Sequence, residues 1–89
     1  MHSIQNTHLR ISVQNKGAEL CSIVSLKNGK EYMWNADPNI WGSYAPVLFP
    51  IIGTLKDGEF DYQGEKYSVS KHGFIRNNEH LQFQQISEN

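Results

Sequence analysis

Apolar and polar residues alternate with a period of two over much of this chain. Leu9, Ile11 and Val13 are separated by polar residues, so their side chains would share one face of an extended strand. Residues 20–26 form a second run of this kind, and Gly17 lies between the two runs. The pattern therefore predicts β-strands at residues 9–13 and 20–26 rather than helices.

A turn signal follows the second run. Asn28-Gly29 is the dipeptide preferred in a type I′ turn, where both central residues have positive φ. Residues 31–34 would return as the second arm of a β-hairpin.

The later part of the chain predicts a second hairpin. Residues 59–62 and 66–69 alternate on either side of Gln63-Gly64-Glu65. Residues 81–86 alternate as well and predict a last strand. By contrast, residues 47–52 are interrupted by proline, which argues against a central strand there.

These elements indicate a fold class. Residues 35–42 are typical of a loop, and the sequence contains no internal repeat, low-complexity tract or linker. We therefore expect one all-β domain of antiparallel strands and hairpins over residues 1–89. A β-sandwich is the usual way for such sheets to bury their apolar faces.

Charge and composition exclude several function classes. Eight Lys and Arg against nine Asp and Glu give no basic patch for nucleic acid. No apolar stretch is long enough to cross a membrane, and the first residues lack the order of a signal peptide, so we expect a cytoplasmic protein. The single cysteine, Cys21, lies in an apolar run and is expected to be a structural thiol rather than a reactive one.

Four histidines are the first candidates for chemistry: His2, His8, His72 and His80. Their spacing does not match a zinc site, so no metal is expected. An isolated histidine is most often a surface or structural residue. His72 differs because Gly73 follows it and Arg76 comes shortly after. An imidazole placed there could exchange a proton with the ring oxygen of a sugar, while the guanidinium holds hydroxyl groups; alternatively, Arg76 pairs with Glu79 at the surface.

Two motifs carry a family resemblance, Pro46-Val47-Leu48-Phe49-Pro50-Ile51-Ile52-Gly53 and His72-Gly73-Phe74-Ile75-Arg76. Together they resemble the N-terminal portion of the aldose 1-epimerase (galactose mutarotase-like) family, in its bacterial branch. The resemblance implies the N-terminal part of a large antiparallel β-sandwich with a sugar cleft. It further implies an isomerase that interconverts the α and β anomers of a hexose by acid/base ring opening.

The resemblance also implies roles for single residues. His72 would be a catalytic and substrate-binding residue near the ring oxygen, and Arg76 would bind sugar hydroxyls or a phosphate. No cofactor is expected, because hemiacetal opening needs only proton transfer. The main acid and base of the family, a histidine and a glutamate, lie downstream of these motifs. Three glutamates of this chain are not assigned as the base, because turns and strand starts usually hold solvated carboxylates: Glu59, Glu65 and Glu79.

Family members are considerably longer than this chain. We therefore expect residues 1–89 to be the N-terminal portion of one domain, folding weakly or with a partner and inactive alone. Thr54 stands where many relatives have arginine, which favours a neutral hexose over a sugar phosphate as the substrate. Three cations keep a sugar phosphate as an open alternative: Arg76, Lys56 and Lys71.

Two alternatives stay open beside the isomerase. One is a catalytically silent carbohydrate-binding protein on the same scaffold. The other is an inactive fragment that forms a homo-oligomer through the edge strand at residues 81–86. Three aromatic residues could stack on a sugar ring or cover a sheet: Trp34, Trp41 and Tyr44.

Overall fold

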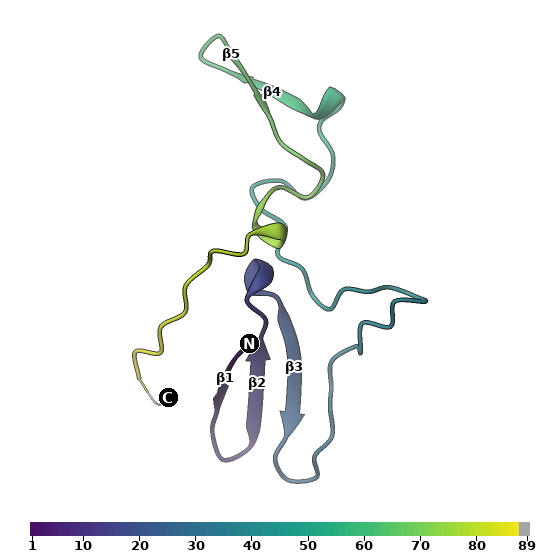
Figure 1. Ribbon diagram of the computed structural model, residues 1–89, viewed down its shortest axis with the longest axis vertical. Helices are drawn as coiled ribbons and strands as arrows, with labels where there is room; N and C mark the ends of the chain where they lie inside the picture. Colours follow the sequence, from purple (N-terminus) through teal and green to yellow (C-terminus); the bar gives the residue numbers. More distant parts are fainter. Residues whose placement is uncertain (88–89) are drawn as a thin grey trace.

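The computed structural model describes residues 1–87 and shows an elongated, thin molecule of 55 × 36 × 16 Å (Figure 1). A three-stranded antiparallel sheet forms one end and a two-stranded hairpin the other. The remaining elements are short 3₁₀ turns, and the described residues form no α-helix, so the predicted all-β class is confirmed. In chain order the elements are β1 (His2–Gln5), β2 (Leu9–Val13), η1 (Lys16–Ala18), β3 (Leu20–Ser25), η2 (Lys56–Gly58), β4 (Glu59–Tyr62), β5 (Glu65–Ser68) and η3 (Ile75–Asn77).

The larger sheet has the order β1-β2-β3. The strands predicted at 9–13 and 20–26 are confirmed as β2 and β3, and their register aligns Ile4, Ile11 and Ile23 across the sheet. The sequence did not predict β1, because Ile4 is its one apolar residue. Pairing with β2 makes it a strand, and the hydroxyls of Ser3 and Ser12 add a hydrogen bond of 2.8 Å.

The hairpin predicted between residues 20–26 and 31–34 is wrong in its second arm. Residues 31–34 form no strand, and a single bridge links Val24 to Glu31. The turn is not type I′ either, since Gly29 has a φ of +73° but Asn28 has no positive φ. The carboxylate of Glu31 explains the difference. It accepts the backbone N–H of Ile23 at 2.8 Å and that of Met33 at 3.0 Å, and so replaces a strand as their partner.

This arrangement makes a pH-dependent contribution to stability. The Ser22 hydroxyl and the two backbone N–H groups lower the pKa of Glu31. The stabilisation is therefore present above the ordinary glutamate pKa, about 4.3, and is lost as the pH falls through the lower pKa of the folded state. We expect Glu31→Gln to unfold more easily than the wild type at pH 6, with the difference vanishing in acid. Urea unfolding of both proteins across this range measures it, and a difference independent of pH would contradict the assignment.

The second hairpin is confirmed with a shift of one residue in its second arm. β4 covers the predicted residues, β5 begins at Glu65, and the rings of Phe60 and Tyr67 stack at 5.3 Å. The strand predicted at residues 81–86 is wrong, because this segment belongs to neither sheet within the described chain. It runs extended instead, and Phe83 stacks on His2 at 4.2 Å. Alternation alone does not make a strand where backbone pairing is missing.

The molecule is a single layer. Among residues 1–87 no hydrophobic side chain is buried, whereas two polar residues are, Ser12 at 6% exposure and Glu19 at 8%. Ile4 of the sheet is 55% exposed. The apolar row of the sheet thus has little covering it, and weak or partner-dependent folding remains our prediction. No helix in the described part of the chain is long and apolar enough to span a membrane.

Candidate functional site

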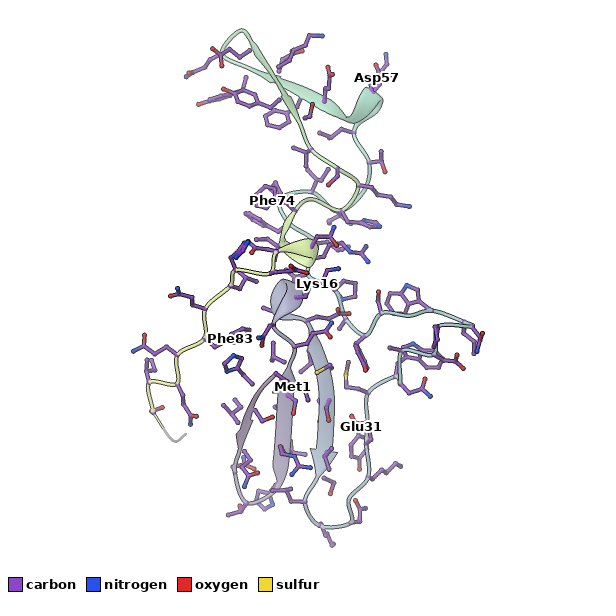
Figure 2. The ribbon with its side chains drawn as sticks, in the orientation of Figure 1. Met1, Lys16, Glu31, Asp57, Phe74 and Phe83 are labelled. Carbon is purple, nitrogen blue, oxygen red and sulfur yellow. The ribbon has the colours of Figure 1, made fainter. Side chains whose placement is uncertain are left out.

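The two sequence motifs meet in space, between the three-stranded sheet and the β4–β5 hairpin. Phe49 and Gly73 form a parallel bridge, and the Phe49 carbonyl accepts the N–H of Phe74 at 2.9 Å. The two phenylalanine rings pack edge to face at 6.4 Å. Figure 2 shows Phe74 at this junction, just above Lys16 of η1. Residues far apart in the sequence are therefore held together by backbone hydrogen bonds.

Gly73 makes this approach possible. Its φ is +79°, and a Cβ atom at this position would lie 1.9 Å from the Phe49 carbonyl oxygen. No side chain fits at that distance, so the bridge requires glycine both for conformation and for space.

His72 is oriented by the same loop. Its backbone, with a φ of +67°, donates its N–H to the Gly53 carbonyl at 2.9 Å, and its ring Nδ1 is hydrogen-bonded to the Ile52 carbonyl. A carbonyl oxygen can only accept, so Nδ1 carries the proton in the neutral ring. Nε2 then keeps its lone pair and can accept a proton from a bound ligand or, once protonated, donate one.

Arg76 lies in η3 and faces a different neighbour. The predicted alternative, a surface pair between Arg76 and Glu79, is wrong, since the ion pair found within residues 1–87 joins Lys66 and Glu59 at 3.9 Å. Arg76 instead borders a polar hollow of about 250 Å³, whose lining is Gln14, Lys16, Glu19, Gly42, Ser43, Arg76 and Asn77. In the described chain no hydrogen bond joins Arg76 to His72. The loop thus carries both residues, but each faces its own surroundings.

Among the remaining candidates, Thr54 directly follows Gly53, the residue whose carbonyl accepts the His72 N–H. The indole N–H of Trp34 donates to the Trp41 carbonyl at 2.9 Å, and both rings are substantially exposed. Glu65 accepts the hydroxyl of Tyr67 in the far hairpin, and Thr54 is exposed. Within residues 1–87 no three His, Cys, Asp or Glu side chains gather as metal ligands.

Cys21 has the environment of a structural thiol. Its Sγ donates to the Ser12 carbonyl at 3.4 Å. Burial, and after it the carboxylate of Glu19, raises the pKa of the thiol. Since the thiolate is the nucleophile, this environment makes Cys21 poorly reactive at neutral pH.

The sequence analysis missed one residue of this region, Glu19. Its side chain is 8% exposed and accepts the backbone N–H groups of Tyr44 and Ala45 at 2.7 and 2.9 Å. One feature of the sequence could have indicated Glu19. It is a charged residue between the Gly17 turn and an apolar strand, and a carboxylate that is buried there needs a partner.

The fold places the chain among galactose mutarotase-like proteins. A galactose mutarotase related enzyme from Lactobacillus acidophilus superposes with a TM-score of 0.78 at 44% identity, over 86% of this chain and 26% of that one. A galactose mutarotase-like protein from Lactobacillus casei ATCC 334 gives a TM-score of 0.80 at 35% identity, with the same coverage. The family model of aldose 1-epimerase matches residues 1–85. The chain belongs to the aldose 1-epimerase family.

Two further relatives are similar to this chain over almost its whole length. The plasmid and chromosomal forms of protein LacX from Lactococcus lactis subsp. lactis are each 34% identical to this chain over 91 aligned positions. The alignment covers 97% of this chain and 30% of each relative. The chain thus spans less than a third of the length of the relatives it matches.

Proposed function

We propose that this chain supplies part of the sugar cleft of an aldose 1-epimerase-like isomerase, which interconverts the α and β anomers of a hexose. The observation that carries the proposal is the orientation of His72: the loop engages Nδ1 and leaves Nε2 open. Family membership and the mutarotase-like relatives support the same reaction.

The reaction requires from the protein only an acid and a base in the correct positions. One group removes the proton of the anomeric hydroxyl while another protonates the ring oxygen, and the open aldehyde rotates before it closes again. His72 lies near the ring oxygen and in its protonated form donates from Nε2 toward it, in support of the main acid, which family members carry downstream. Arg76 binds sugar hydroxyls with its planar array of N–H donors. A neutral hexose is the preferred substrate and a sugar phosphate the less favoured one, and the reaction uses no cofactor.

The base comes from outside these residues. Glu59 is paired with Lys66 and Glu65 with Tyr67, both in the β4–β5 hairpin. We therefore expect the 89-residue chain to bind sugar weakly without accelerating anomer exchange. A cytoplasmic location and a homo-oligomer remain predictions.

A second candidate is a carbohydrate-binding protein on the same scaffold that leaves the anomers unchanged. Thr54 favours it, because a hydroxyl replaces the cation that many relatives carry there and contributes no charge to a bound sugar.

A chimera separates the two candidates. Residues 1–89 replace the matching segment of the Lactobacillus acidophilus relative, and exchange between the anomeric protons of glucose and galactose is followed by NMR. Faster exchange supports the isomerase, whereas sugar binding without faster exchange supports the silent protein. If the folded chimera neither binds nor exchanges either sugar, both candidates fail. Glucose 6-phosphate, measured in parallel, tests the preference for a neutral hexose.

Arg76→Ala is expected to weaken sugar binding by the chimera about tenfold or more, because hydrogen bonds from a charged donor contribute about 1.5–3 kcal/mol. Arg10→Ala is the matched control, since Arg10 is exposed on β2 and pairs with Gln5 and Val24 in the sheet. Titration of the sugar gives both dissociation constants. Equal losses in the two variants would argue against contact between Arg76 and the sugar.

A further inference from the structure

The turn that contains η1 touches both segments of the candidate site. η1 packs against η3 near the centre of the molecule (Figure 1). The Gly17 N–H donates to the Asn78 carbonyl at 2.8 Å. A Cβ atom on Gly17 would lie 2.5 Å from the Arg76 carbonyl oxygen, so only glycine lets η3 come this close.

Glu19 holds the other segment from the same turn. Its Oε1 accepts the backbone N–H groups of Tyr44 and Ala45, and its Oε2 accepts the side-chain amide of Gln14 at 2.5 Å. Burying a carboxylate is costly unless donors surround it, and here they do. The donors come from a segment 25 and 26 positions away in the sequence, so the carboxylate fixes a tertiary contact rather than a local turn.

These contacts close a ring through the site. Residues 44–45 lead directly into Pro46 and on to Phe49, whose carbonyl holds Phe74. Phe74 precedes η3 with Arg76, and η3 returns to Gly17. Removing the Glu19 carboxylate frees residues 44–45, and the contact of η3 with the three-stranded sheet then depends on Gly17.

We propose that Gly17 and Glu19 are positioning residues that set the placement of Arg76 and of the Phe49–Gly73 bridge for sugar binding. That the ligand is a sugar rests on the function proposed above. The placement of Arg76 and of the Phe49–Gly73 bridge can be tested without a sugar.

Glu31 provides a matched control. It too accepts backbone N–H groups through its carboxylate, but these belong to Ile23 and Met33, beside the three-stranded sheet. Glu31→Ala therefore removes a hydrogen-bonded carboxylate without touching the ring of contacts.

The experiment compares Glu19→Ala, Glu19→Gln and Glu31→Ala in the 89-residue chain by ¹⁵N NMR. In Glu19→Ala we expect the Tyr44 and Ala45 amides to exchange about tenfold faster or more, since each loses a hydrogen bond to a charged acceptor. The Arg76 side-chain N–H and the Phe74 amide shift as well, while the sheet signals stay. Glu19→Gln keeps an oxygen acceptor and restores most of this behaviour, and Glu31→Ala leaves these signals in place.

Two results overturn the proposal. One is unchanged Arg76 and Phe74 signals in Glu19→Ala although the Tyr44 and Ala45 amides exchange faster. The other is displacement of the Arg76 and Phe74 signals in Glu31→Ala equal to that in Glu19→Ala, which would mean that loss of either carboxylate loosens the fold and that Glu19 does not position Arg76 in particular. If Glu19→Ala unfolds the sheet as well, the smaller perturbation in Glu19→Gln takes its place: faster exchange at Tyr44 and Ala45 must come with shifted Arg76 and Phe74 signals, and unshifted signals overturn the proposal. If glucose and galactose leave the wild-type spectrum unchanged, binding of these sugars by this chain fails, while the placement result still stands.

Discussion

Gly73→Ala is expected to break the contact between the two motifs. The added Cβ would stand 1.9 Å from the Phe49 carbonyl oxygen and 2.7 Å from the Pro50 nitrogen, both backbone atoms that cannot rotate away. Either residues 49–50 or the loop at residue 73 must move, and the Phe74 hydrogen bond is lost with that movement. We expect the local opening free energy of this bridge to fall by about 3 kcal/mol or more, as for other substitutions that force backbone displacement. Hydrogen exchange at the Phe74 amide measures it.

Gly64→Ala separates the steric effect from the conformational one. Gly64 has a φ of +80°, nearly that of Gly73, but nothing lies within 4 Å of a Cβ placed there. Its substitution should cost about 1 kcal/mol, the ordinary penalty for a left-handed alanine. Comparable losses in the two variants would show that φ alone, and not the approach to Phe49, accounts for Gly73.

Local patterns predicted the paired strands well and the unpaired segments poorly. β2 and the β4–β5 hairpin follow from alternation and turn residues, which act within a few positions of the chain. Residues 31–34, predicted from the turn before them, and residues 81–86, predicted from alternation, form no strand because their backbone groups have other partners or no neighbouring strand. Whether an alternating segment becomes a strand depends on tertiary neighbours, which a local pattern does not contain.

The sequence predicted which residues belong to the candidate site but not how they are arranged in space. The motifs identified His72 and Arg76, with Gly73 directly after His72. The bridge partner of Gly73, Phe49, comes from the other motif and could not be derived from spacing. Glu19 was missed because its donors belong to Tyr44 and Ala45, and a buried carboxylate can be understood only with its donors present.

The direction of Arg76 shows the same dependence on tertiary contacts. In the structure η3 places Arg76 beside the hollow next to Gln14 and Glu19, whereas His72 turns to Ile52 and Gly53. A sugar that contacts both residues must therefore bridge the two sides of the loop.

His72→Asn should lower the rate of anomer exchange in the chimera by about 10²- to 10⁴-fold, the usual contribution of one general acid or base. Asparagine suits this position because it tolerates the φ of +67° found at His72. Its amide can still donate to the Ile52 carbonyl in place of Nδ1. What it lacks is the second ring nitrogen, Nε2, so proton transfer to the sugar is lost while the loop keeps its shape. Exchange between the anomeric protons of galactose gives the rate.

His8→Asn completes the comparison. His8 is exposed in the turn before β2, next to the Asn6 side chain that accepts its backbone N–H, and it is remote from the Phe49–Gly73 bridge. This variant should exchange the anomers as fast as the parent chimera. A His72→Asn protein that binds galactose normally and keeps the parental rate would place the acid elsewhere and leave His72 as a structural residue of the loop. A loss of rate with binding retained would assign proton transfer to His72, because the variant preserves the hydrogen bond to Ile52 and removes only the imidazole ring.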